Sequence, residues 1–173
     1  MLRGERIMLA PLRDEDSRTL FGWINDREDV LLSAPYKPVH AADHAQWFEA
    51  IRGRDDVVIF AIRTLDDDRL IGSCQLHSID HRSRSAELQI RLGEPDARGQ
   101  GLGSEALGLL MRHGFDDLNL HRIWLRVFAT NERAIGAYEK AGFDVEGRLR
   151  DGAYVDGNYA DVVVMARLRT AAS

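Results

Sequence analysis

A glycine-rich segment, Arg98-Gly99-Gln100-Gly101-Leu102-Gly103, has the residue types and spacing that most directly suggest chemistry. Glycines let a backbone approach an anion without a Cβ in the way, and the unpaired amides of a first helical turn favour negative charge. Residues 86–92 before the segment alternate between apolar and polar, and apolar residues recur at three- and four-residue spacing after it. These patterns predict a strand that leads into the loop and an amphipathic helix that leaves it. We therefore expect the loop to bind a phosphate group.

Two well-known phosphate loops do not fit this segment. A Walker loop requires Gly-Lys-Ser/Thr, whereas Gly103 is followed by Ser104 and Glu105. A dinucleotide fingerprint lies near the start of a βαβ unit with an acidic residue about twenty positions on. Here the glycines follow residues that are typical of successive antiparallel strands. Judged on glycine spacing alone, an ordinary strand-to-helix turn is the alternative.

A second block of sequence identifies a family resemblance. The loop fits the Arg/Gln-x-x-Gly-x-Gly/Ala signature of the GNAT acyl-CoA N-acyltransferases, and residues 131–143 resemble that superfamily's Asn-x-x-Ala-x-x-x-Tyr-x-Lys-x-Gly-Phe segment. The chain is most similar to the ribosomal-protein N-terminal acetyltransferases and the spermidine acetyltransferases, and the resemblance does not choose between them. It implies acetyl transfer from acetyl-CoA to a primary amine, which is a protein N-terminus, a polyamine or another small amine. A non-catalytic acyl-CoA-binding module and transfer of another acyl group, such as succinyl, are the alternatives.

The resemblance also implies where the cosubstrate is held. Loop amides would cradle the pyrophosphate, and backbone groups of the preceding strand would pair with the pantetheine arm. In relatives that strand and the strand after the helix splay apart to admit the arm. The implied cofactor-binding residues are Ile90, Arg91, Leu92, Arg98, Gly99, Gln100, Gly101, Leu102, Gly103, Asn131 and Arg133.

Two side chains are candidates for proton transfer. Tyr138 matches the family tyrosine whose hydroxyl reaches the sulfur, and a phenol can protonate a thiolate once geometry is fixed. Its alternative is a packing role. Glu87 matches a glutamate that many relatives carry on the strand before the loop, and it could take the proton of the incoming ammonium. Its alternative is a solvated or ion-paired strand residue, and some relatives have no identifiable base.

Length, charge and composition argue for one domain and against nucleic-acid-binding and membrane-spanning functions. A length of 173 residues suits one domain over residues 1–173, and a net charge of −5 argues against nucleic-acid binding. No apolar stretch is long enough to span a membrane, so we expect a cytoplasmic protein; relatives are often homodimers.

Several other residues are given structural roles. Cys74 is expected to be a buried hydrophobe, Trp23 and Trp47 to pack in the core, and His40 and His44 not to form a metal site. No metal is expected. A further hypothesis is that a polyamine binds to the acids Asp26, Glu28, Asp29 and Glu49.

These residues must be positioned by an α/β fold. The patterns predict strands at 7–9, 57–63, 69–77, 83–92, 122–129, 143–148 and 160–168, and helices starting near 14, 42, 102 and 131. An acidic turn at 65–68 predicts a hairpin, and helix crossovers are expected between the later elements. We therefore expect a mixed central sheet, antiparallel on its N-terminal side and parallel around the loop, with helices on both faces.

Overall fold

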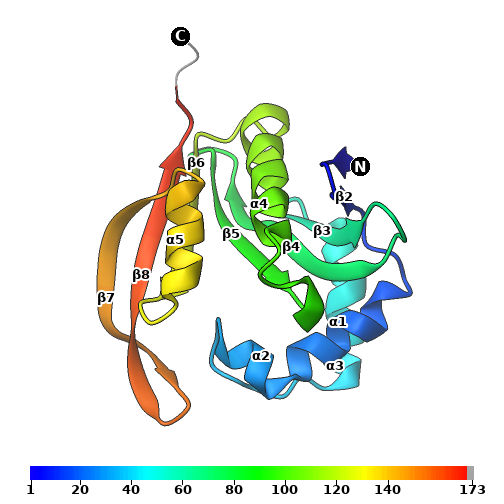
Figure 1. The fold of residues 1–173 in the computed structure, drawn as a ribbon, viewed down its shortest axis with the longest axis horizontal. Coiled ribbons are helices and arrows are strands. Elements are labelled where there is room, and N and C mark those ends of the chain that lie inside the picture. The colour runs from blue at the N-terminus through cyan, green and yellow to red at the C-terminus, as the bar shows by residue number, and fades with distance from the viewer. Residues whose placement is uncertain (171–173) are drawn as a thin grey trace.

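A computed structural model describes residues 1–170, whose strands form one eight-stranded mixed sheet in the order β1-β2-β3-β4-β5-β6-β8-β7 (Figure 1). The strands are β1 (Leu2–Arg3), β2 (Ile7–Ala10), β3 (Val57–Thr64), β4 (Leu70–Asp80), β5 (Ser85–Leu92), β6 (Arg122–Phe128), β7 (Asp144–Val155) and β8 (Asn158–Leu168). The helices are α1 (Asp16–Asn25), α2 (Arg27–Leu31), α3 (Ala41–Ala50), α4 (Leu102–Arg112) and α5 (Glu132–Lys140).

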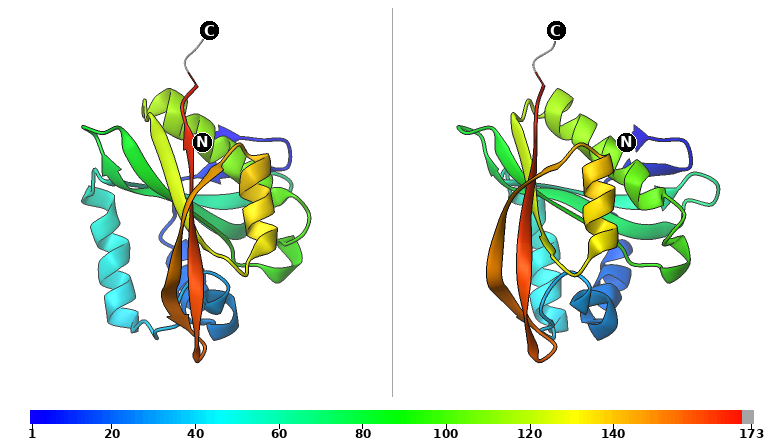
Figure 2. Two further views of the ribbon diagram at one scale, coloured as in Figure 1. Left: turned by 90° about the vertical axis from the view of Figure 1, so that its left-hand side faces the viewer. Right: turned by 60° about the vertical axis from the view of Figure 1, so that its left-hand side comes forward.

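Helices cover both faces of the sheet, as expected. Helices α4 and α5 lie on one face, and α3 lies on the other (Figure 2). The spacing of Leu102, Ala106, Leu109 and Leu110 places them on one side of α4, where all four are buried against the sheet. No helix within residues 1–170 has the length and apolar character needed to cross a membrane.

The sheet opens where β5 and β6 diverge. These two strands are parallel and pair only between Ser85–Glu87 and Arg122–Trp124, although β5 continues to Leu92 and β6 to Phe128. Every other neighbouring pair in the sheet of residues 1–170 is antiparallel. The splay implied by the family resemblance is therefore present (Figure 1), and the residues of β5 beyond Glu87 have no strand partner on the β6 side within residues 1–170.

The last two strands are longer than expected and form a hairpin. Strand β8 lies between β6 and β7, and a tight turn at Asp156 and Gly157 joins β7 to β8 without a helix. Both turn residues have positive φ, 49° and 83°, which suits the right-handed twist of a hairpin. The strands predicted at 143–148 and 160–168 were therefore too short at this end, because an Asp-Gly pair favours a tight turn between two longer strands.

Two helical features also differ from expectation. Helix α2 was not predicted; it starts because the Asp26 carboxylate accepts hydrogen bonds from the amides of Glu28 and Asp29. A five-residue helix is too short to show apolar periodicity. The helix after the glycine loop ends at Arg112 and is followed by one π-helical turn, His113–Asp117.

Candidate active site

The main cleft, of about 940 Å³, lies between the diverging strands and gathers most of the predicted cofactor-binding residues. Its walls come from β5, the glycine loop, the start of α4, α5 and the end of α2. Of the predicted residues, those that line it are Ile90, Arg91, Leu92, Arg98, Gly99, Gly101, Gly103, Asn131, Arg133 and Tyr138. Gln100 and Leu102 do not: the Gln100 side chain donates to the Asp96 carbonyl oxygen at 2.5 Å, and the Leu102 side chain is buried in the core.

The glycine loop offers unpaired hydrogen-bond donors to the cleft. Gly99 and Gly101 have φ of 78° and 81°, a left-handed conformation that glycine adopts without steric cost. Within residues 1–170, the amides from Gly99 to Ser104 have no hydrogen-bond acceptor. Because these amides precede and open α4, the helix dipole adds to their attraction for an anion.

The N-terminal segment holds the loop in place. One Glu105 carboxylate oxygen accepts from the amides of Glu5, Arg6 and Ile7 at 2.7, 2.9 and 3.3 Å. The Arg6 guanidinium in turn donates to the Gln100 carbonyl oxygen at 2.8 Å. Partial burial alone would raise the pKa of Glu105, but these amides together with Arg6 lower it below its ordinary value.

The side chain of Arg98 connects the glycine loop with two other elements of the chain. Its Nε donates to the Leu92 carbonyl oxygen at 3.0 Å, and its Nη2 lies 2.5 Å from Oδ2 of Asp29. It therefore joins the loop to the end of β5 and to α2.

Basic side chains make the cleft positive, although the whole chain is acidic. Arg126, Arg133 and Lys140 line it. A Cβ built on Gly99 would lie 3.7 Å from a guanidinium nitrogen of Arg133, so this charge lies beside the loop. Arg133 and Lys140 form no ion pair with any of the described residues, and both are exposed. Sequence analysis missed Arg126 and Lys140, although Lys140 belongs to the Tyr-x-Lys part of the second motif.

Tyr138 and Asn131 reach the cleft from α5. Asn131 caps the helix as expected, with its Oδ1 accepting from the Ala134 amide at 3.1 Å. The Tyr138 ring packs edge-on against Phe143, at 5.8 Å between centroids, and its hydroxyl has no hydrogen-bond partner within residues 1–170. Burial raises the pKa of Tyr138 above its ordinary value, so the phenol keeps its proton.

Glu87 is buried beside the cleft and does not line it. Its carboxylate is paired with Arg126, at 2.9 Å between Nε and Oε1, and Arg126 lines the cleft. The Arg126 guanidinium also lies 5.8 Å from the centre of the Trp124 ring. The ion-paired arrangement considered for Glu87 is therefore present.

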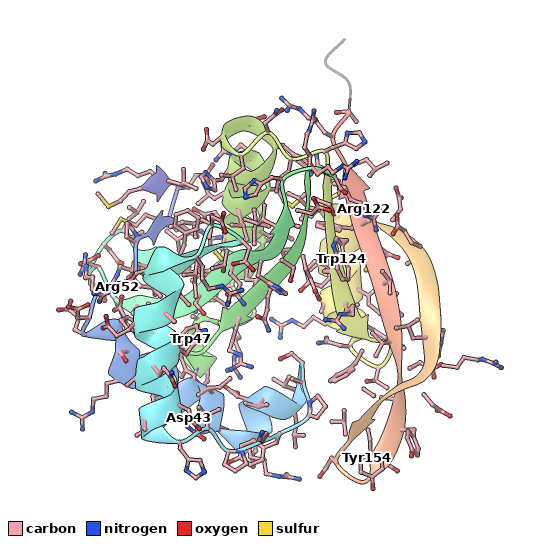
Figure 3. The ribbon with its side chains drawn as sticks, turned by 180° about the vertical axis from the view of Figure 1, so that it is seen from behind. Asp43, Trp47, Arg52, Arg122, Trp124 and Tyr154 are labelled. Carbon is pink, nitrogen blue, oxygen red and sulfur yellow. The ribbon has the colours of Figure 1, made fainter. Side chains whose placement is uncertain are left out.

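A second, side cavity of about 410 Å³ lies between α1, α3 and the face of β3, β4 and β5. Its lining includes Trp23, Trp47, Asp43 and Arg91, and Arg91 also lines the main cleft, so the two spaces meet there. Figure 3 shows Asp43 and Trp47 on α3 in front of the sheet. The expectation of a core position for Trp47 was wrong, because 38% of that residue is exposed at the mouth of this cavity.

Three of the four acids considered for polyamine binding are engaged by other groups of the chain. Asp26 caps α2, Asp29 pairs with Arg98, and Glu49 lies 3.5 Å from Arg52. None of the four lines the side cavity, where Asp43 is the acidic lining residue within the described part of the chain.

The remaining candidates have structural positions. Cys74 is buried as expected, and burial strongly raises the pKa of its thiol. Nε2 of His44 lies 2.9 Å from the Ser17 carbonyl oxygen. No group of three or more His, Cys, Asp or Glu residues in the described chain is arranged to hold a metal ion.

Comparison with known proteins agrees with this geometry. Residues 6–144 match the family model described as an acetyltransferase (GNAT) domain. The chain is 39% identical to spermidine N(1)-acetyltransferase of Escherichia coli (strain K12) over 99 residues, which are 57% of this chain and 53% of that protein, so the match spans about half the length of this curated relative. It is 26% identical to the putative ribosomal N-acetyltransferase YdaF of Bacillus subtilis (strain 168), over 93% of this chain and 84% of that one. Spermidine N-acetyltransferase from Vibrio cholerae, in a crystal structure with CoA and spermine, superposes with a TM-score of 0.89 at 27% identity, covering 95% of this chain and 96% of that one.

Proposed function

This chain belongs to the GNAT acetyltransferase family, and from that premise we propose that it moves an acetyl group from acetyl-CoA to a primary amine. The observation that carries the proposal is the row of unpaired amides from Gly99 to Ser104 at the base of the main cleft. Unpaired donors at a helix N-terminus suit a diphosphate, and the cleft leads from them to Tyr138.

The residues present fit coenzyme A. The loop amides would hold the diphosphate, and the unpaired cations Arg133 and Lys140 would meet the further phosphate charge. Beyond Glu87, β5 has no strand partner on the β6 side, so its backbone groups there would pair with the amides of the pantetheine arm. When bound, acetyl-CoA supplies the activated acyl thioester.

Groups of the chain itself would then orient the reacting atoms and transfer the protons. The neutral amine nitrogen forms a bond to the acyl carbon, the carbon–sulfur bond breaks, and the Tyr138 hydroxyl donates its proton to the departing sulfur. The nitrogen then loses its extra proton, which restores the Tyr138 hydroxyl and leaves a neutral amide. A β5 amide that faces the cleft would stabilise charge on the acyl oxygen, an effect of about 3 kcal/mol where it has been measured.

For the proton of the incoming ammonium we propose Glu87, acting through water. The carboxylate is buried and held by Arg126, so a water beside Arg126 would connect it with the cleft. Glu87 is thus both the base in this proposal and the residue that fixes Arg126.

A thiol-release assay tests the proposed function. The protein is mixed with acetyl-CoA and a panel of amines, and the free thiol of CoA is measured, with calorimetry of CoA binding alongside. We expect CoA to bind and at least one amine to accelerate thiol release. Tight CoA binding without turnover on any amine would indicate a non-catalytic binding module, and an absence of CoA binding would refute the assignment of the cleft.

Assembly and location complete the proposal. The β7–β8 hairpin exposes Val145, Leu149, Tyr154 and Tyr159, each about half exposed or more, and β7 is an edge strand (Figure 3). We propose that this face joins two copies of the chain, since exposed apolar clusters on an edge strand favour association. The reaction needs a compartment that contains acetyl-CoA, so the cytoplasmic location expected from the sequence belongs to this proposal, as does a reaction without metal.

A further inference from the structure

Arg91 is a cation at the junction of the two cavities, and it has no partner among the described residues. Within residues 1–170 its guanidinium forms no hydrogen bond and no ion pair, although the residue is only partly exposed. The nearby carboxylate of Asp29 is already held by Arg98 at 2.5 Å. Burial is the main cause that lowers the pKa of Arg91; the charge of Asp29 opposes this effect, and the charge of Arg98 adds to it. A guanidinium nevertheless stays charged in proteins, so it favours an anion as its partner.

The other shielded arginines among residues 1–170 each have a partner within the chain: Arg167 donates to the Ala141 carbonyl oxygen at 2.8 Å, and the rest hold a carboxylate. Arg63 is paired with Asp16, Arg98 with Asp29, and Arg122 with Glu146. Arg91 departs from this pattern at a position that faces both the main cleft and the side cavity. The missing partner is therefore expected to come from a ligand.

The side cavity is mainly apolar. Trp23, Ile24, Trp47 and Ile59 supply large apolar surfaces, and Asp43 is the acidic lining residue among those described. A polyamine carries several positive charges and needs several carboxylates, which this cavity does not offer. An aromatic or branched apolar group suits its walls, and its volume of about 410 Å³ accommodates such a side chain.

We propose, resting on the acetyl transfer proposed above, that the acceptor is an amino-acid-like amine. Its carboxylate pairs with Arg91, its apolar side chain fills the side cavity, and its amine, one carbon from the carboxylate, points into the main cleft. Bidentate pairing of a guanidinium with a carboxylate fixes both position and orientation. Neither a polyamine nor a protein N-terminus carries a carboxylate next to its amine, so this acceptor class differs from both.

The test compares an amino acid with its amide, which differ in the carboxylate. L-Phenylalanine and L-phenylalaninamide are assayed as acceptors with acetyl-CoA in wild type, Arg91→Gln and the control Arg82→Gln. Arg82 lies in the exposed β4–β5 turn, away from both cavities. We expect wild type and Arg82→Gln to prefer the acid in kcat/KM by about ten- to hundredfold, because a hydrogen bond to a charged group is of that strength. Arg91→Gln should bring the ratio close to one. The amide has the less basic amine, so intrinsic reactivity favours it and opposes the expected result.

Three results would overturn the proposal. The amide could serve as well as the acid in wild type, or spermidine or an N-terminal peptide could exceed both. Alternatively, succinyl-CoA could be preferred over acetyl-CoA, with that preference lost in Arg91→Gln; this would assign the guanidinium to a carboxylate on the acyl donor.

A binding measurement separates this proposal from the proposed function. Calorimetry of L-phenylalanine and L-phenylalaninamide with the CoA-bound protein requires no turnover. Selective binding of the acid, lost in Arg91→Gln, would support the carboxylate site even if no amine were acetylated. Equal or absent binding of the two compounds would refute it even if another amine proved to be acetylated.

Discussion

At the scale of the residue, the hydroxyl of Tyr138 is the group best placed to protonate a thiolate in the main cleft. It lines the cleft, is free of partners within residues 1–170, and burial raises its pKa. We expect Tyr138→Phe to lower kcat by about a hundredfold or more, as for removal of a positioned general acid. Stability should stay within about 0.5 kcal/mol of wild type, since the ring contact with Phe143 remains.

The pH profile gives a second readout for Tyr138. A proton donor works below its pKa, and burial moves the pKa of Tyr138 upward from the ordinary 10.0. Wild-type kcat should therefore hold through neutral and mildly alkaline pH without a fall caused by this group. An unchanged kcat in Tyr138→Phe, in a protein shown by calorimetry to bind CoA normally, would rule out the role.

Glu87 and Arg126 require a paired comparison, because each holds the other. If Glu87 takes the ammonium proton, Glu87→Gln should lower kcat/KM by about a hundredfold at neutral pH. The deficit should shrink as the pH approaches the amine's own pKa, about 10 for a simple primary amine, where free amine is abundant. Arg126→Gln should keep the wild-type shape of the profile. If both variants show the same loss and the same profile, Glu87 acts only by holding Arg126.

At the scale of the element, the contact of the N-terminal segment with α4 fixes the glycine loop. Glu105 is mostly shielded and accepts three amide hydrogen bonds, so Glu105→Gln should lower the free energy of unfolding by about 2 kcal/mol at pH 7. The folded-state pKa of Glu105 is lowered, so its stabilisation is present above the ordinary value of 4.5 and is lost as the pH falls through the folded-state pKa.

Denaturant unfolding at several pH values measures this difference. The gap between wild type and Glu105→Gln should close as the medium becomes acidic. Glu139→Gln, which changes an exposed acid on α5, is the matched control and should leave stability within about 0.5 kcal/mol of wild type. A gap that persists unchanged below the folded-state pKa would show that the difference does not arise from the charge of Glu105.

At the scale of the whole molecule, the β7–β8 hairpin is expected to join two copies of the chain. Tyr154 and Tyr159 pack together near its end, with ring centroids 5.1 Å apart, and are 57% and 68% exposed. Replacing both with serine should shift the protein from dimer to monomer in light scattering, because it removes much of the exposed apolar surface. The variant Trp47→Ser, which removes an exposed aromatic group on another face, should leave the dimer intact. A monomeric wild type would contradict the proposed interface.

Some of the site could be predicted because it depends on neighbours in sequence. The alternation of residues 86–92, the glycines after them and the helix that follows obey local backbone rules, and Asn131 caps α5 through a residue three positions on. The Asp156-Gly157 turn is just as local, since an Asp-Gly pair between two strand-like segments is itself a signal for a tight hairpin turn. The family motifs likewise located Tyr138, which the structure places in the main cleft.

The amino-acid sequence by itself therefore determined the family, the sheet around the loop and the position of the loop amides for which we propose phosphate binding. Tertiary structure alone decided which charges meet: Asp29 with Arg98, Glu87 with Arg126, and no partner for Arg91 within residues 1–170. Helix and turn signals act over a few residues, whereas an ion pair joins side chains from separate elements, 69 and 39 positions apart in these two cases. Composition and periodicity place such residues on a face but do not select their partners, because the partners depend on how the elements pack.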